Sequence, residues 1–112
     1  MAYDRDLADR IRDAFAGLAV REVKMFGGLT FMVNEKMTAT ANTHGDLMIR
    51  CDPSRVEDLL ARDGADWPEM RGKKMSKGWI VVEAGRIESD KVLGSWLDEA
   101  LDYNEKVTGS GD

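Results

Sequence analysis

Histidine and cysteine, the residue types that most often serve as bases, nucleophiles or metal ligands, occur once each in this sequence, as His44 and Cys51. A hydrolytic triad needs a nucleophile, a base and an orienting group, and a zinc site needs three or four ligands. His44 lies in a turn-forming segment, residues 43–46, and we expect it to be exposed. Cys51 ends an apolar run beside Asp52, whose charge would raise the thiol pKa, so we expect a buried and unreactive side chain. The sequence predicts no catalytic residue, no metal site and no cofactor, and it favours a protein that is not an enzyme.

Positive charge gathers in one segment of an otherwise acidic chain of net charge −5. Four basic residues lie within seven positions: Arg71, Lys73, Lys74 and Lys77. Trp67 and Trp79 flank this segment, so that aromatic surface and positive charge together form a candidate site for a partner or ligand. A solvated turn would explain the same charges without any ligand. Because proteins that grip nucleic acid usually carry a basic face, the acidic total disfavours direct nucleic-acid binding.

A glycine pair marks the other candidate site, within the segment Lys24–Met37. Two strand-like runs meet at Gly27 and Gly28, where a bulge, a sharp bend or a close backbone approach is expected. The pair lacks the spacing of a phosphate-binding loop. A cleft near Lys24, Phe26 and the two glycines, together with the basic segment, is the predicted location for a small anionic ligand.

These residues must be positioned by a mixture of helices and strands. Helical periodicity and capping residues predict helices over about residues 4–18, after Asp52-Pro53 and after Ser89. Alternation predicts strands at 20–26, 29–33, 37–42, 47–51 and 79–82, with a short one at 70–75. The order is helix, three to four strands, helix, two strands, helix. This predicts an α+β, two-layer fold with an antiparallel sheet of about five or six strands and helices on one face.

The same periodicities predict which side chains form the core. The first helix would bury Leu7, Ile11, Ala14, Phe15 and Leu18, and the last would bury Val92, Leu93, Trp96, Leu97, Ala100 and Leu101. Six methionines lie on or beside predicted strands: Met25, Met32, Met37, Met48, Met70 and Met75. We favour a core position for them over an adaptable binding surface, the alternative that methionine also suits.

Chain-level features predict a cytoplasmic protein with no membrane association. No apolar run approaches the roughly 18–20 residues that span a bilayer. The charged N-terminus lacks the apolar segment of a secretory signal, and a single cysteine cannot form an intrachain disulfide. We expect one domain over residues 1–107 and a disordered tail over residues 108–112.

Three segments together resemble the N-terminal domain of the TfoX/Sxy family: Lys24–Asn34 with its Met-Phe-Gly-Gly motif, Leu47–Arg50, and Met75–Val82. The resemblance extends from about Leu7 to about Leu101. It implies a two-layer fold with an antiparallel sheet. Characterised members regulate bacterial competence genes as coactivators beside a cyclic-AMP receptor-type transcription factor, and they carry a C-terminal helical domain that these 112 residues do not include. The motif residues could equally be a structural signature of the family.

The leading expectation is therefore a regulatory or protein-interaction domain, connected with transcription, that binds a protein partner or forms a homodimer. The alternative is a binding domain for a small anionic ligand, at Lys24, the glycine pair and the segment Arg71–Lys77. Direct DNA binding and catalysis rank behind both.

Overall fold

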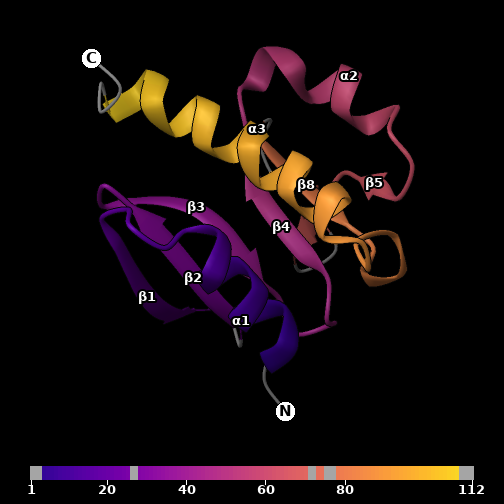
Figure 1. Cartoon of the computed structure of the whole chain (residues 1–112). Helices are drawn as coiled ribbons and strands as arrows, with labels where there is room; N and C mark the ends of the chain where they lie inside the picture. Colours follow the sequence, from indigo (N-terminus) through magenta and orange to yellow (C-terminus); the bar gives the residue numbers. More distant parts are fainter. Residues whose placement is uncertain (1–3, 26–27, 71–72, 75–77, 109–112) are drawn as a thin grey trace.

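Six strands form one antiparallel sheet with the spatial order β1-β2-β3-β4-β8-β5 (Figure 1). The computed structural model describes residues 4–25, 28–70, 73–74 and 78–108. The strands of the sheet are β1 (Val20–Met25), β2 (Gly28–Val33), β3 (Lys36–Ala41), β4 (Leu47–Arg50), β5 (Ala65–Asp66) and β8 (Trp79–Val82). A separate two-stranded sheet pairs β6 (Glu69–Met70) with β7 (Lys73–Lys74).

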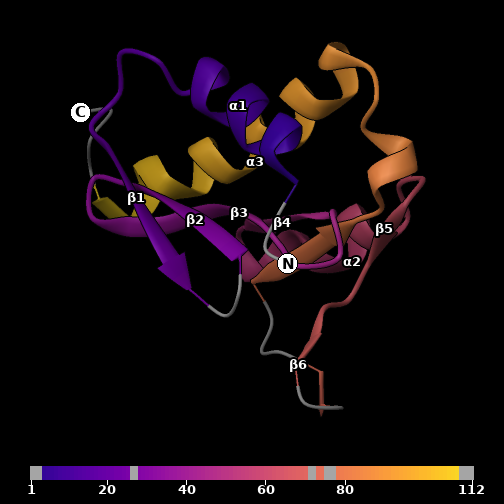
Figure 2. The same ribbon diagram turned by 90° about the horizontal axis from the view of Figure 1, so that it is seen from below.

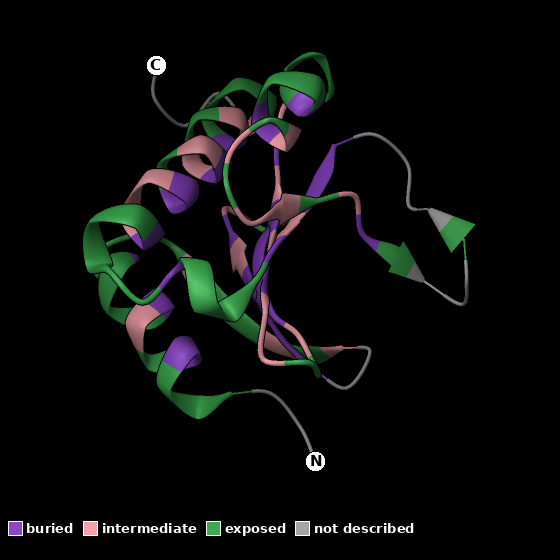
Figure 3. Cartoon of the chain, turned by 90° about the vertical axis from the view of Figure 1, so that its right-hand side faces the viewer, coloured by how far each residue is buried: buried purple, intermediate pink, exposed green. Residues whose placement is uncertain are grey.

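Two long helices, α1 (Arg5–Ala14) and α3 (Asp90–Thr108), lie together on one face of the sheet (Figure 2). The shorter α2 (Val56–Leu60) follows a 3-10 turn at Pro53–Arg55 and packs near β8; a second 3-10 turn, Ala84–Arg86, follows β8. The β6–β7 hairpin extends away on the side opposite α1 and α3 (Figures 2 and 3). The predicted α+β fold, an antiparallel sheet of about five or six strands with helices on one face, is confirmed. The sixth strand of the sheet is β5, whereas the described part of the strand predicted at 70–75 belongs to the separate hairpin.

Local capping chemistry sets where the helices begin. The Asp4 carboxylate accepts hydrogen bonds from the backbone N–H groups of Asp6 and Leu7, at 2.8 and 3.2 Å, and so satisfies donors that the first helical turn leaves unpaired. Ser89 accepts one from the backbone N–H of Lys91 at 3.2 Å. Both predicted caps are confirmed.

The ends of the outer helices differ from the sequence prediction. The first helix ends at Ala14 rather than near residue 18, and Leu18 lies beyond it with 44% of its surface exposed. Val92 is 38% exposed although it was expected in the core, because it lies just outside the buried stripe of α3. That helix runs to Thr108, one residue into the predicted tail, and residues 109–112 lie outside the described part of the chain.

Gly28 confirms the expected close approach of two backbones. A Cβ atom at this position would lie 2.5 Å from the Ala41 carbonyl oxygen and 3.1 Å from Asn42 Cα. Because β2 pairs with β3 along this edge, neither backbone can retreat without breaking strand pairing. Of the other residues of the motif, Met25 ends β1, and Phe26 and Gly27 lie outside the described residues.

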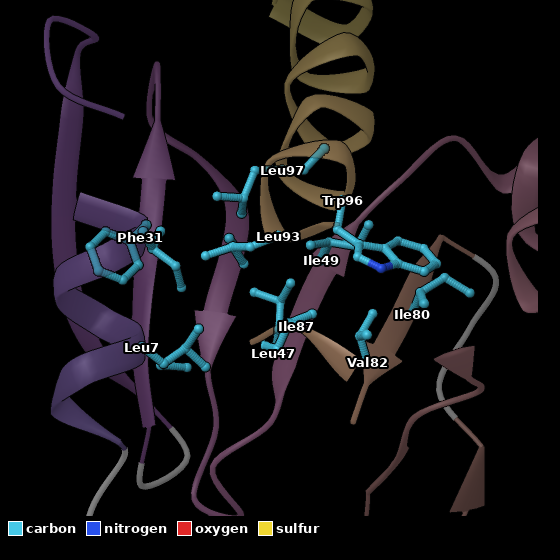
Figure 4. Close-up of a cluster of buried hydrophobic side chains, with 14 of the residues drawn as sticks. Leu7, Phe31, Leu47, Ile49, Ile80, Val82, Ile87, Leu93, Trp96 and Leu97 are labelled. Carbon is cyan, nitrogen blue, oxygen red and sulfur yellow. The ribbon is translucent and has the colours of Figure 1, made fainter. Parts of the chain in front are cut away.

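One hydrophobic core fills the space between the sheet and the helices (Figure 4). On the sheet, alternate residues such as Phe31, Ile49 and Ile80 point into it, and Trp96 of α3 is 1% exposed at its centre. Phe15, which follows α1, meets Phe31 edge to face with ring centroids 6.3 Å apart. The core thereby fixes α1 and α3 on one face of the sheet.

Candidate functional site

His44 and Cys51 lie in the environments expected from the sequence. His44 is exposed in the turn between β3 and β4. Cys51 is buried, and its pKa is raised to about 11, first by burial and then by the negative charges of Glu99 and Asp52. The thiol therefore stays protonated near neutral pH, which disfavours nucleophilic attack. Within the described ranges, no three His, Cys, Asp or Glu side chains come together as a metal site would require.

The described residues of the predicted ligand cleft lie at two different edges of the sheet. Lys24 is exposed on the edge strand β1, whereas the hairpin that carries Lys73 and Lys74 lies in the chain between β5 and β8, at the opposite edge. Of its other members, Phe26, Gly27, Arg71 and Lys77 lie outside the described residues. The cleft stays a prediction.

The two tryptophans that flank the basic segment take part in packing. Trp67 is half-buried and packs against the main core. Trp79 is 6% exposed and lies in β8, where it pairs across the strands with Arg50. Lys73 is exposed in β7.

For the four methionines whose burial the structure describes, the core prediction is wrong; Met75 and the side chain of Met70 lie outside the described part of the chain. Met25, Met32, Met37 and Met48 are all half-buried, and the core contains none of them. Strand alternation explains the error, because a methionine between two inward-facing residues must point to the opposite face. Met48 does so between Leu47 and Ile49.

Pairing across the strands defines the face of the sheet that lies opposite the described helices (Figure 3). A row of partners crosses five strands: Val23, Thr30, Thr40, Met48 and Val81. The hydroxyls of Thr30 and Thr40 share a buried hydrogen bond of 3.0 Å in the middle of the row. We call the half-buried apolar residues of this side the open face: Val23, Met25, Met32, Met48 and Val81.

A second feature, which the sequence did not reveal, surrounds Arg50 at the end of β4. Its guanidinium carbon lies 5.6 Å from the ring centroid of Trp79 and 5.7 Å from that of Tyr103 in α3. Arg50 Nε is buried and is the single such side-chain polar atom, among the described residues, without a hydrogen-bond partner. The side chain lines a cavity of about 450 Å³. The cavity is bordered by Met32, Glu35, Lys36, Met37, Arg50, Ala100, Tyr103, Asn104 and Val107.

Two of the polar residues at this cavity are already paired within the fold. Glu35 accepts a 2.8 Å hydrogen bond from Arg21, which is the main cause that lowers the pKa of the Glu35 carboxyl group. Asn104 is buried and donates from Nδ2 to the Val33 carbonyl at 2.9 Å, while its Oδ1 accepts from Asn34 at 3.1 Å. These contacts fix the β2–β3 turn against α3 and so shape one wall of the cavity.

The sequence predicts the side of the strand on which Arg50 lies, but not its contacts with Trp79 and Tyr103. The alternation of Leu47–Arg50 places Arg50 on the side of the strand away from Leu47 and Ile49. The facing tryptophan comes from a strand much later in the chain, and Tyr103 from the last helix. Nothing in the spacing of these residues predicts that they meet.

An antiparallel sheet with helices on one face, and a single core between them, defines a small two-layer α+β domain. A family profile described as the TfoX N-terminal domain matches residues 13–103, most of the chain. The chain belongs to this family, as its resemblance predicted. A comparison with curated proteins found no match. Among the described helices, none combines the length and apolar character needed to cross a membrane.

Proposed function

We propose that this chain is a non-enzymatic regulatory domain that binds a protein partner, in a process connected with transcription. Membership of the TfoX N-terminal domain family supports this proposal. The observation that carries it is the open face, whose half-buried apolar residues lie on one side of the sheet. The helices α1 and α3 lie on the other side (Figures 2 and 3).

The composition of the open face suits recognition of another protein. Three of its five residues are methionines, whose flexible and polarisable side chains adapt to the shape of an apolar partner. The side chains come from β1, β2, β4 and β8, so the surface is held by the pairing of the sheet rather than by loops. We therefore expect a partner that presents an apolar segment to this sheet.

Substitution of Met48 tests the proposal most simply. Met48→Lys places a charge in the middle of the open face, and an ammonium group that must be desolvated on binding should weaken capture of the partner at least about tenfold. Val92→Lys is the matched control, because Val92 is an exposed apolar residue of α3 on the other layer. The measurement is quantitative affinity capture with the tagged wild type and both variants.

Two outcomes of that experiment oppose the proposal. One is the failure of the wild type to retain any reproducible transcription-related protein. The other is equal retention by Met48→Lys and the wild type while both are folded by circular dichroism. Loss from Met48→Lys with retention by Val92→Lys supports it.

Self-association is the narrower form of this proposal, with a second copy of the chain as the partner. The edge strand β1 carries Arg21, Glu22 and Lys24, all exposed, and such charges discourage strand-to-strand pairing at a sheet edge. A homodimer would therefore use the open face. Sedimentation that shows only a 12.5 kDa species at micromolar concentrations excludes this form.

The absence of catalysis is part of the same proposal. An exposed His44 and a protonated Cys51 give no support to nucleophilic chemistry. Assays of the purified chain with generic esterase and phosphatase substrates should give no turnover above that of the unfolded protein.

A further inference from the structure

The cavity beside Arg50 combines positive charge, an apolar wall and donors that lack acceptors. None of the described hydrogen bonds or ion pairs involves the Arg50 side chain, although a guanidinium carries five N–H donors. The rings of Trp79 and Tyr103 hold it by cation–π contacts. The side chain is therefore positioned by packing, while its buried Nε has no acceptor among the residues that the structure describes.

Such an arrangement costs free energy unless something else accepts the hydrogen bonds. A buried donor left unpaired costs about 1–3 kcal/mol, and buried groups of this kind are rare enough to call for an explanation. Gly78 contributes to the enclosure, since a Cβ there would lie 3.5 Å from Arg50 Nε. The aromatic contacts offset part of the cost but accept no hydrogen bond.

The other residues at the cavity indicate which acceptor fits. Lys36 is exposed at the start of β3 and adds a second cation. The negative charge of Glu35 is matched by its ion pair with Arg21. The remaining wall is largely apolar, formed by Met32, Met37, Ala100 and Val107. The local balance of charge is positive in a chain whose total is −5.

We propose that this cavity binds a small organic carboxylate with an apolar body, the carboxylate accepting from Arg50 and the body lying against Met37 and Val107. A planar carboxylate matches the fork of a guanidinium, and pockets of a few hundred Å³ with an apolar wall and few polar groups are typical ligand sites. The site is separate from the predicted cleft at Lys24 and the basic hairpin, and Met32 is the residue that it shares with the open face.

Titration of the ¹⁵N- and ¹³C-methyl-labelled chain with hexanoate tests this proposal. Saturable shifts are expected at Arg50 Nε–H, the Trp79 indole, the Met37 methyl group and Val107, at concentrations up to about 10 mM. Hexanamide, which has the same apolar body without the charge, and inorganic phosphate, which has charge without the body, should shift these signals at least about tenfold more weakly.

Substitutions of basic residues test whether hexanoate binds in the cavity. Arg50→Lys keeps the charge but loses the fork, and it should weaken hexanoate binding about tenfold or more. Lys36→Gln, at an exposed position, should weaken it about threefold. Lys91→Gln removes the same charge at an exposed position near the start of α3, outside the cavity, and should leave the affinity unchanged.

Several results would overturn the proposal: no saturable shift with hexanoate, equal shifts with hexanamide, tighter binding of phosphate, or equal effects of Lys36→Gln and Lys91→Gln. If Arg50→Lys fails to fold, the comparison of the two lysine variants decides the question.

Discussion

Several charged side chains of this domain form ion pairs between segments that are distant in the sequence. Arg55 of the 3-10 turn before α2 binds Glu99 of α3 at 2.8 Å, and Lys106 binds Asp52 at 2.9 Å. Exposed pairs of this kind contribute little each, typically about 0–1 kcal/mol. Arg50 differs, because its positive charge is held by two aromatic rings and has no carboxylate partner among the described residues.

At this scale, Asp52 should make the stability of the domain sensitive to acid. Its pKa is lowered from 3.8 to about 2, first by the hydrogen bond from Lys106 and then by the backbone N–H and hydroxyl of Ser54. Because the folded state favours the ionised carboxylate, the contribution is fully present above pH 3.8 and is lost as the pH falls towards about 2. Asp52→Asn should therefore flatten the loss of stability across this window.

Urea unfolding followed by circular dichroism at successive pH values measures this effect. Glu22 and Glu35 also have lowered pKa values through their pairs with Arg12 and Arg21, so the slope of the variant should be reduced rather than abolished. An unchanged slope for Asp52→Asn would show that Lys106 does not engage the carboxylate in solution.

At the scale of elements, the pairing of β2 with β3 depends on the missing side chain of Gly28. Gly28→Ala would place a Cβ 2.5 Å from a backbone oxygen of β3, and the overpacking should destabilise the domain by about 1–3 kcal/mol. Gly94→Ala is the control in α3, where a Cβ meets nothing within 4 Å. This second change should stabilise the helix by about 0.5–1 kcal/mol.

Chemical denaturation of the two variants gives both numbers. The sign of the difference is the informative quantity, since both substitutions add the same methyl group. Gly28→Ala as stable as the wild type would mean that β2 and β3 do not approach as closely as described.

The elements themselves were largely predictable, because their signals are local. Caps at Asp4 and Ser89 and the apolar run of β8 can each be read within a few residues of sequence. The end of the first helix was not, since the apolar period continues to Leu18 while the helix ends at Ala14. Tertiary packing, which buries Phe15 and leaves Leu18 outside, decides that boundary.

Features that depend on the distance between segments could not be predicted. Alternation fixes which strand residues share a face, but it does not show which face the helices cover, and so it cannot place the methionines in or outside the core. The meeting of Arg50, Trp79 and Tyr103 joins two strands and a helix. No periodicity or motif in the sequence predicts that these three residues come into contact.

The whole molecule has two unlike faces (Figure 3). One face of the sheet is sealed by α1 and α3 over a continuous core, and the other presents the open face with its methionines. Because both long helices cover one face of the sheet, the apolar residues of the open face are available to another molecule. This asymmetry is the physical basis of the proposed regulatory role.

Photo-crosslinking in cells that express the chain tests this claim most directly. A photoreactive amino acid in place of Met48 reports what touches the open face, and the same group in place of Val92 reports what touches the helical layer. We predict a discrete adduct with a transcription-related protein from position 48 and no such adduct from position 92. Adducts of equal yield from both positions, or none from position 48, would contradict it.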